Sequence, residues 1–337
     1  MDRLERRDFL ALGGSLLLAQ AAGLTQAAAA ESSSSARPPV PKALPQAWTK
    51  APTIPLWPGE PPGGAGYKPQ KLPANMDPTW IRNIARPELH VFRPSKPNGH
   101  ALLVMPGGAY LFVSIGNEGV DVAKRMNALG MTVFVLTYRL PNEGWTPRAD
   151  VPLQDAQRAM RVIRAQATKY KISPDSLSAI GFSAGGNLAA CLATQHAEQV
   201  YTAVDAADSL SAKPFAAGLI YPVVTMEKPW THDLSRRMLL GDHPTDAEVA
   251  HRSAERNVTA DTPPTFLAHA MDDTDVPVEN SIHMMEALRK AKRPVEAHFF
   301  QEGHHAFGVG RPNTPSAQWI DLFHAWHMRL ISTSPAH

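Results

Sequence analysis

Ser183 lies in the segment AIGFSAGGN, residues 179–187, with one glycine two positions before it and another two positions after it. An apolar run precedes the serine and a helix-forming run follows it, which is the setting in which Gly-x-Ser-x-Gly turns sharply and exposes the serine hydroxyl. Side chains at Gly181 and Gly185 would strike neighbouring backbone in such a turn, and the serine backbone is expected to be strained. Because unpaired N–H groups at the start of a helix favour nearby negative charge, Ser183 is the candidate nucleophile.

A serine nucleophile needs a base, and the base needs an acid that orients it. The segment TFLAHAMDDTDVPVENS, residues 265–281, contains three aspartates where a strand-like run ends. The pattern Asp-x-x-Val-Pro places Asp273 at the exit of that strand, and we therefore take it as the acid. Asp272 and Asp275 stay open as alternatives, although either could instead form a turn or cap a helix.

The candidate base lies in VEAHFFQEGHHAFGVG, residues 295–310, where another strand-like run ends in a glycine-bearing loop with two adjacent histidines. We favour His305 over His304, because His-x-Phe in such a loop is typical of a catalytic histidine and the order serine, aspartate, histidine is the expected one. Adjacent side chains diverge and no third ligand is evident, so the pair is a poor metal site and neither a metal nor a cofactor is predicted. The other histidines, His269, His324 and His327 among them, are interpreted as core or surface residues.

The charge that develops during such a reaction needs hydrogen-bond donors. The segment LLVMPGGAYLF, residues 102–112, ends a strand and turns through two glycines. We expect the backbone N–H groups of Gly108 and Ala109, joined by that of Ala184, to form an oxyanion hole.

The elements that position these residues alternate along the chain. Short runs that are apolar throughout are typical of strands buried on both faces, and the amphipathic stretches between them supply the crossovers of a parallel sheet. We therefore expect one α/β domain over residues 57–334, with a mostly parallel sheet, helices on both faces and a helical cap-like insertion at 225–261. Expected strands lie within 101–108, 132–141, 177–186, 215–224, 265–273 and 296–303, and expected helices within 118–130, 153–170, 187–199, 279–291 and 316–331.

The N-terminal residues are interpreted as a processing segment and a linker. Residues 1–30 contain Arg6 and Arg7, then an apolar stretch and the run AAAA at 27–30, an arrangement that resembles a twin-arginine export signal. The stretch is too short to serve as a permanent membrane anchor, so we expect cleavage, a periplasmic or secreted protein and no stable membrane association afterwards. Residues 31–56 are rich in Pro and Ser and are expected to be an irregular linker.

Composition excludes several classes of protein. The chain has 337 residues, of which 44% are hydrophobic and 19% charged, which suits a globular domain. The net charge is +2 and the basic residues are scattered, so no nucleic-acid partner is expected. The one cysteine, Cys191, excludes an intrachain disulfide and is interpreted as a buried apolar residue.

From about Trp57 to Trp319 the chain resembles the exported bacterial esterases of the α/β-hydrolase superfamily that are grouped with acetylxylan esterases and feruloyl-esterase-like enzymes. The resemblance implies Ser183 as nucleophile, Asp273 as acid and His305 as base. The chain departs from the family pattern at Ala109, His304 and Ala306, where the family usually has glycine, and the second of these keeps His304 open as an alternative base. The segments that carry the likeness are LWPGEPPG, MPGGAYLFVSIGNEGVDVA, FVLTYRLP, PLQDAQRAMRVIR, GFSAGGNLAA, LIYPVVTM, DTPPTFLAHAMDDTDVPVENS and EGHHAFGVG.

The same resemblance implies a small-molecule or oligosaccharide ester substrate, such as O-acetyl groups on plant-polysaccharide sugars. Tyr110, Trp145 and Trp230 are candidates to offer flat faces to a sugar ring, unless they only pack loops against the body. Glu118 and Asp155 are interpreted as helix-capping or tethering carboxylates rather than as a glycosidase pair. The alternatives are a broad-specificity carboxylesterase, a prolyl-oligopeptidase-type peptidase, which usually has a further gating domain, and a binding protein on an inactive scaffold. The sequence does not predict an oligomeric state.

Overall fold

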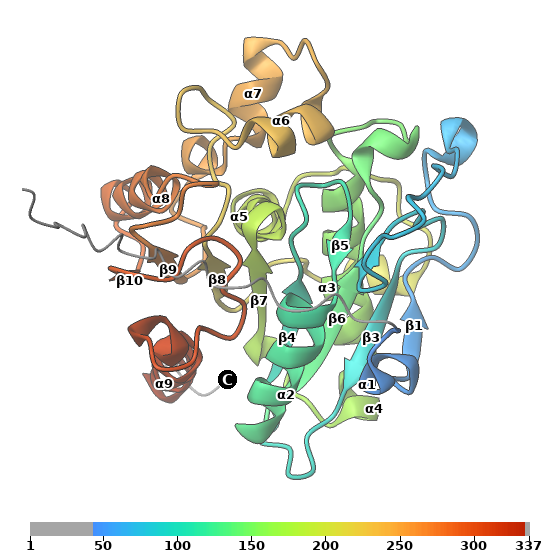
Figure 1. Cartoon of the computed structure of the whole chain (residues 1–337). Coiled ribbons are helices and arrows are strands. Elements are labelled where there is room, and N and C mark those ends of the chain that lie inside the picture. The colour runs from blue at the N-terminus through green and yellow to red at the C-terminus, as the bar shows by residue number, and fades with distance from the viewer. Residues whose placement is uncertain (1–42, 334–337) are drawn as a thin grey trace, which may run out of the picture. The chain divides into compact units, whose positions relative to one another are not determined.

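A computed structural model describes residues 43–333 of the chain. Its centre is an eight-stranded sheet in the order β1-β3-β6-β4-β7-β8-β9-β10 (Figure 1). β3 runs antiparallel to both of its neighbours, and all pairs from β6 to β10 are parallel. The strands are β1 (Thr53–Pro55), β3 (Glu88–Phe92), β4 (Ala101–Met105), β6 (Thr132–Thr137), β7 (Leu177–Phe182), β8 (Ala217–Ile220), β9 (Thr265–Ala270) and β10 (Val295–Phe300), while β2 (Trp80–Ile81) and β5 (Val113–Ser114) form a separate pair.

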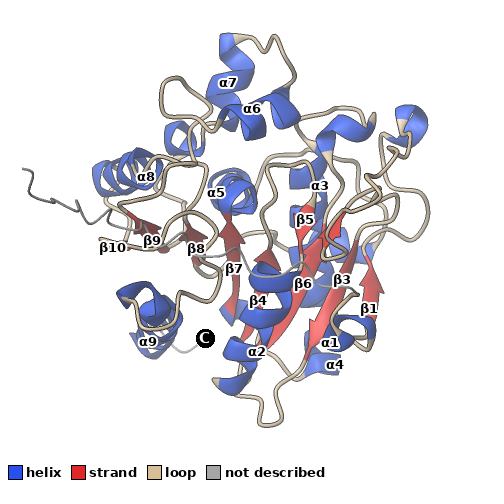
Figure 2. Ribbon diagram, viewed as in Figure 1, coloured by secondary structure: helices blue, strands red, loops and turns tan. Residues whose placement is uncertain are grey.

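Helices cover both faces of this sheet (Figure 2). α2 and α9 lie on one face, where Arg125 of α2 and Asp321 of α9 approach to 3.6 Å. α3 and α5 lie on the other face, where Gln157 Nε2 of α3 donates to the carbonyl of Gln195 of α5 at 3.0 Å. Every residue of β4, β6, β7, β8 and β9 is buried, which explains their predominantly apolar sequences. The helices are α1 (Gln46–Thr49), α2 (Asp121–Ala128), α3 (Val151–Ala165), α4 (Ala167–Tyr170), α5 (Ser183–Gln195), α6 (Asp233–Leu240), α7 (Asp246–Arg252), α8 (Glu279–Lys290) and α9 (Trp319–Thr333).

The expected α/β class and mostly parallel sheet are confirmed, but the boundary of the linker is wrong. Residues 46–55, assigned to an irregular segment, contain α1 and the edge strand β1. Trp48 stacks on His90 with ring centroids 3.5 Å apart, and the side chain of Ile54 is buried. Burial of these two apolar side chains stabilises an ordered conformation that the high proline content argued against. The expected export signal at residues 1–30 lies outside the described residues.

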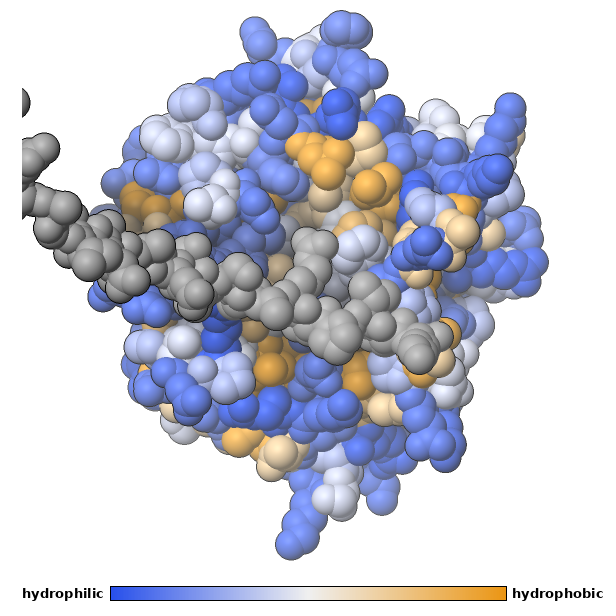
Figure 3. Space-filling view, viewed as in Figure 1, coloured by the Kyte–Doolittle hydropathy of each residue, from blue (hydrophilic) through white to orange (hydrophobic). Residues whose placement is uncertain are grey.

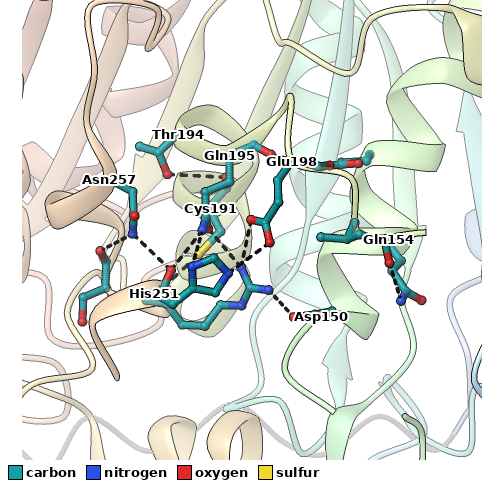
Figure 4. Close-up of polar contacts among 12 residues, drawn as sticks. Asp150, Gln154, Cys191, Thr194, Gln195, Glu198, His251 and Asn257 are labelled. Atoms are coloured by element: carbon teal, nitrogen blue, oxygen red, sulfur yellow. Dashed lines mark hydrogen bonds and ion pairs between the residues drawn. The ribbon is translucent and has the colours of Figure 1, made fainter. Parts of the chain in front are cut away.

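The expected insertion at 225–261 contains α6 and α7, which lie beyond the C-terminal ends of the strands (Figure 1). Arg252, at the end of α7, is 2% exposed; it pairs with Asp150 and donates to Gln195 Oε1 at 3.1 Å. Gln195 in turn donates to the carbonyl of His251 at 3.0 Å (Figure 4). These polar contacts connect the insertion to Asp150, directly before α3, and to the last residue of α5. Within residues 43–333, no helix combines the length and the apolar character that crossing a bilayer requires.

Candidate active site

Ser183, His305 and Asp273 form a continuous chain of hydrogen bonds at the C-terminal ends of β7, β9 and β10. The Ser183 hydroxyl oxygen lies 2.8 Å from Nε2 of His305, and Nδ1 of His305 lies 2.7 Å from Oδ2 of Asp273. Since the carboxylate accepts the Nδ1 proton, Nε2 is left as an acceptor for the serine hydroxyl. The arrangement can therefore withdraw a proton from the serine.

Asp273 is oriented by several donors besides His305. Its Oδ1 accepts from the backbone amides of Asp275 and Val276 at 3.0 and 2.9 Å. Its Oδ2 also lies 3.2 Å from Nε2 of His269, whose Nδ1 is 2.8 Å from the hydroxyl of Ser281. The carboxylate thus has little freedom to rotate away from the base.

These contacts shift the pKa values of both partners. Burial opposes ionisation of Asp273, but the hydrogen bonds from His269 and His305, together with the charge of His305, outweigh it and hold the pKa of the carboxyl below its ordinary value. Burial alone would lower the pKa of His305, yet the hydrogen bond and charge of Asp273, with the charges of Glu118 and Asp275, raise it. Asp273 therefore carries the negative charge that favours a proton on His305 during reaction.

The alternative histidine and aspartate pair with each other instead. Nδ1 of His304 lies 3.1 Å from Oδ2 of Asp272, and the amide of His304 donates to Oδ1 of the same residue at 2.8 Å. The His304 side chain is 58% exposed, against 14% for His305. Each of the two adjacent histidines thus contacts one of the two adjacent aspartates, and of the two only His305 is hydrogen-bonded to Ser183.

The turn around Ser183 has the tight geometry that its sequence predicts. Ser183 has φ 51°, in the left-handed region that a residue with a side chain adopts only under strain. A Cβ on Gly181 would lie 2.0 Å from the carbonyl oxygen of Gly185, and one on Gly185 would lie 2.2 Å from that of Met105. Glycine is therefore required at both positions.

The loop after β4 lies directly against this turn. A Cβ on Gly107 would come within 2.8 Å of the Cβ of Ser183, and the next three residues, Gly108, Ala109 and Tyr110, have φ of 125°, 55° and 58°. Among residues 43–333, the amides of Gly108, Ala109 and Ala184 have no hydrogen-bond acceptor. These three donors remain available to an oxygen atom next to Ser183.

Residues 89–288, more than half of the chain, match the BD-FAE family. The chain belongs to this family. It is 38% identical over 208 residues to endo-1,4-beta-xylanase B of Butyrivibrio fibrisolvens and 30% identical over 234 residues to an acetylxylan esterase of Xylanibacter ruminicola. The matches cover 62% and 68% of this chain but 32% and 45% of those two proteins, so this BD-FAE chain spans less than half the length of each of them.

A solved structure extends the comparison to nearly a whole protein. The acetyl ester-xyloside bifunctional hydrolase from Caldicellulosiruptor lactoaceticus is 32% identical, with a TM-score of 0.71. The alignment covers 83% of this chain and 96% of that one. The BD-FAE chain therefore has the α/β-hydrolase fold, in agreement with the resemblance in its sequence.

The three aromatic residues considered for sugar binding differ in exposure. Tyr110 is 1% exposed and donates to Asn187 Oδ1 at 2.9 Å, and Trp145 is 4% exposed and packs on Tyr67. Burial leaves neither ring with a free face, so the structure argues against both as sugar platforms. Trp230 is 39% exposed and lies three residues before α6 begins.

Three residues that contact the site were not predicted from the sequence to do so. Glu118 accepts from the amide of Gly107 at 2.7 Å, so it contacts the oxyanion loop and is not merely a helix tether. Tyr221 donates to Glu118 at 2.9 Å, and His269, interpreted as a core or surface residue, contacts Asp273. Tyr221 directly follows β8, and His269 is the second-last residue of β9. These positions at strand ends were the signal in the sequence that could have indicated a place in the site. Asp155 does act as a tether, since it accepts from Trp57 Nε1 at 2.9 Å and pairs with Arg139.

No group of three or more His, Cys, Asp or Glu side chains is arranged to hold a metal ion within residues 43–333. Cys191 is buried beside Asn187, and burial raises the pKa of its thiol to about 12. A thiol with so high a pKa is a poor nucleophile.

Proposed function

We propose that this protein is a serine carboxylester hydrolase that removes acetyl groups from plant polysaccharides or oligosaccharides. The observation that carries the proposal is the chain of hydrogen bonds from Ser183 through His305 to Asp273, at 2.8 and 2.7 Å. The two relatives named for acetyl-ester chemistry, an acetylxylan esterase and an acetyl ester-xyloside hydrolase, support the acyl group and the sugar.

The mechanism follows from the positions of the donors and acceptors. Nε2 of His305 takes the hydroxyl proton as Oγ of Ser183 attacks the ester carbonyl, and Asp273 stabilises the imidazolium that forms. The amides of Gly108, Ala109 and Ala184 donate to the negatively charged oxygen of the tetrahedral intermediate. His305 then gives the proton to the departing sugar oxygen, which leaves an acetyl group on Ser183. Water, deprotonated by the same histidine, releases acetate and restores the serine.

A broad-specificity carboxylesterase is the second candidate, and the burial of Tyr110 and Trp145 favours it. Figure 3 shows hydrophobic side chains gathered below the region of α6 and α7, on the side of the molecule where the strands end. An apolar surface there suits a short acyl or aryl group as well as a sugar ring.

The test compares acetate release from acetylated xylo-oligosaccharides with hydrolysis of p-nitrophenyl acetate by the purified protein. We expect both substrates to react and kcat/KM to favour the acetylated sugar. Ser183→Ala should lower kcat by about 10³-fold or more and abolish labelling by a fluorophosphonate. Reaction with aryl acetates alone would support the broad carboxylesterase, and an unchanged Ser183→Ala variant would show that the scaffold is not a serine hydrolase.

We also propose export through the twin-arginine route, on the basis of residues 1–30. N-terminal sequencing of the protein recovered from the periplasm or medium of a host is expected to find a mature chain that begins near Ala30. Retention of Arg6 and Arg7 in that protein would contradict the proposal.

A further inference from the structure

The carboxylate of Glu118 makes both of its hydrogen bonds to parts of the active site. Glu118 is 2% exposed and lies in the helical turn η2 (Gly116–Val120) before α2. Its Oε2 accepts from the amide of Gly107 at 2.7 Å, immediately before the residues that supply the oxyanion donors. A carboxylate that only capped its own helix would accept from amides of that helix, and none of the bonds to Glu118 comes from there.

Tyr221 continues the connection from Glu118 to the loop that carries His305. Its hydroxyl donates to Oε1 of Glu118 at 2.9 Å and accepts from the amide of Gly308 at 3.0 Å. Since the amide can only donate, the hydroxyl proton of Tyr221 is directed at Glu118. The tyrosine is fully buried, and its ring lies edge-on to the imidazole of His305 with centroids 5.1 Å apart.

Gly107, Glu118, Tyr221 and Gly308 therefore form one hydrogen-bonded chain between the oxyanion loop and the histidine loop. Both loops contain left-handed residues, Ala109 and Ala306 among them, so neither conformation is the one that its residues prefer alone. A buried bridge of charge-assisted hydrogen bonds is strong enough to hold such loops in place.

Resting on the proposed serine hydrolase function, we propose that Glu118 is a positioning residue that, through Gly107 and Tyr221, keeps the oxyanion donors and His305 aligned on Ser183. Glu118 does not touch the substrate in this proposal. It acts through the two loops, and its charge acts on His305 across Tyr221.

The charges around His305 give the proposal a second observable. Two acidic residues of the loop after β9, Asp273 and Asp275, face the imidazole, and Glu118 faces it from η2. Tyr221, directly after β8, and His232, at the start of α6, also face it. Burial lowers the pKa of His305, and the charges of Asp273, Glu118 and Asp275 raise it. Burial also raises the pKa of Glu118, although the hydrogen bonds from Gly107 and Tyr221 act to lower it. Tyr138 is a further buried tyrosine whose pKa is affected by the charge of this carboxylate. Loss of the Glu118 charge therefore lowers the pKa of His305.

The experiment compares Glu118→Gln, Tyr221→Phe and Glu143→Gln with the unchanged protein. Glu143 is a matched control, because its carboxyl is also buried and accepts from the amide of Asn83 at 2.8 Å, without a contact to either loop. For each protein, kcat and KM are measured for p-nitrophenyl acetate, kcat/KM is measured against pH, and folding is checked by thermal melting.

We expect Glu118→Gln to lower kcat by about 10- to 100-fold with KM within about 3-fold, because small displacements of catalytic groups mainly affect the transition state. Its acid limb of kcat/KM should move to lower pH. Tyr221→Phe keeps the charge, so it should lower kcat and leave the acid limb in place. Glu143→Gln should match the unchanged protein in both respects.

The inference is overturned if Tyr221→Phe and a folded Glu118→Gln both have the same kcat as the Glu143→Gln control. It is also overturned if the acid limb of the pH profile of kcat/KM is at the same pH in Glu118→Gln as in the unchanged protein. Should Glu118→Gln fail to fold, Tyr221→Phe alone decides, and an unchanged kcat in that variant rejects the proposed bridge. A protein that hydrolyses no ester, or whose Ser183→Ala variant stays active, refutes the proposed function itself. The two failures are thus distinguishable.

Discussion

Oδ2 of Asp273 contacts two histidines at once, with Nδ1 of His305 at 2.7 Å and Nε2 of His269 at 3.2 Å. His269 is fully buried on β9, and its Nε2 also lies 3.1 Å from the carbonyl oxygen of Val276. The second histidine therefore links the carboxylate of Asp273 to the turn that follows it. A residue that sequence analysis interpreted as core or surface is a core residue that also orients the site.

Replacement of His269 should affect both stability and rate. His269→Phe keeps the approximate size of the ring but leaves Ser281 and Val276 without their buried partner, which we expect to lower the free energy of unfolding by about 1–3 kcal/mol. Because Asp273 then loses one of its donors, kcat should fall by about 10-fold, the loss expected from a small displacement of a catalytic group. Urea unfolding and p-nitrophenyl acetate kinetics measure the two effects. Full activity in the variant would mean that the remaining donors orient Asp273 without His269.

The pH profile should be set by His305 on its acid side. The base works only when it is neutral, so activity is lost as the pH falls through the pKa of His305, which lies above its ordinary value of 6.5. The pKa of Asp273 lies below its ordinary value of 3.8, so this carboxylate stays ionised across that range. We expect kcat/KM to fall with a single acid limb centred above pH 6.5. A limb centred near pH 4 would assign the titration to a carboxylate instead.

Two alanines in the loops next to Ser183 and His305 are under backbone strain. Ala109 and Ala306 have φ of 55° and 57°, in the left-handed region that costs an alanine more than a glycine. Ala306→Gly should therefore raise the free energy of unfolding by about 0.5–1 kcal/mol, after allowance for the greater chain entropy of glycine.

Ala287→Gly, in the last turn of α8, is the control in a right-handed helical backbone and should lower the same quantity by about 0.5–1 kcal/mol. Urea unfolding of the two variants gives the comparison. A loss of stability in Ala306→Gly as large as that in the control would show that the left-handed conformation costs the alanine nothing.

The ion pair of Arg139 and Asp155 should be the most sensitive electrostatic contact outside the site. Both side chains are fully buried and lie 2.8 Å apart, and Arg139 lies over the rings of Trp57 and Trp145. Arg139→Met leaves an unpaired buried carboxylate and should lower the free energy of unfolding by about 3–5 kcal/mol. The double variant Arg139→Met with Asp155→Leu should recover part of that loss in urea unfolding. A double variant that is less stable than Arg139→Met would contradict this account of the pair.

Trp230 separates the two candidate substrate classes. It is 39% exposed, and its ring lies edge-on to His283 with centroids 6.2 Å apart. If a sugar stacks on this ring, Trp230→Ala should raise KM for acetylated xylo-oligosaccharides by about 5- to 10-fold, the share of binding energy typical of one stacked aromatic. KM for p-nitrophenyl acetate should stay unchanged. Equal effects on both substrates would exclude a role in sugar recognition.

Most of the fold could be predicted from local patterns. The strands β4, β6, β7 and β8 in the parallel part of the sheet were visible as predominantly apolar runs, because a strand buried on both faces has no polar side. The edge strand β10 is only partly buried, and its sequence includes Glu296 and His298. The edge strand β1 could not be predicted, because three residues, Thr53–Pro55, are too few to show a period and contain a proline. Only its pairing with β3 and the burial of Ile54 order this segment.

The turn at Ser183 could be predicted from the local sequence, because a Cβ on Gly181 would strike the backbone of Gly185, only four residues later in the chain. The crowding at Gly185 comes instead from Met105 at the end of β4 and therefore depends on the tertiary structure. The tertiary fold was needed to show that His305, 122 residues from Ser183, and Asp273, 32 residues from His305, meet there while His304 pairs with Asp272. Only the tertiary structure also showed that Glu118 reaches Gly107 and Tyr221, and that Tyr110 and Trp145 are buried. Such contacts depend on the order of the strands and the paths of the loops, which bring distant residues together without leaving a local pattern in the sequence.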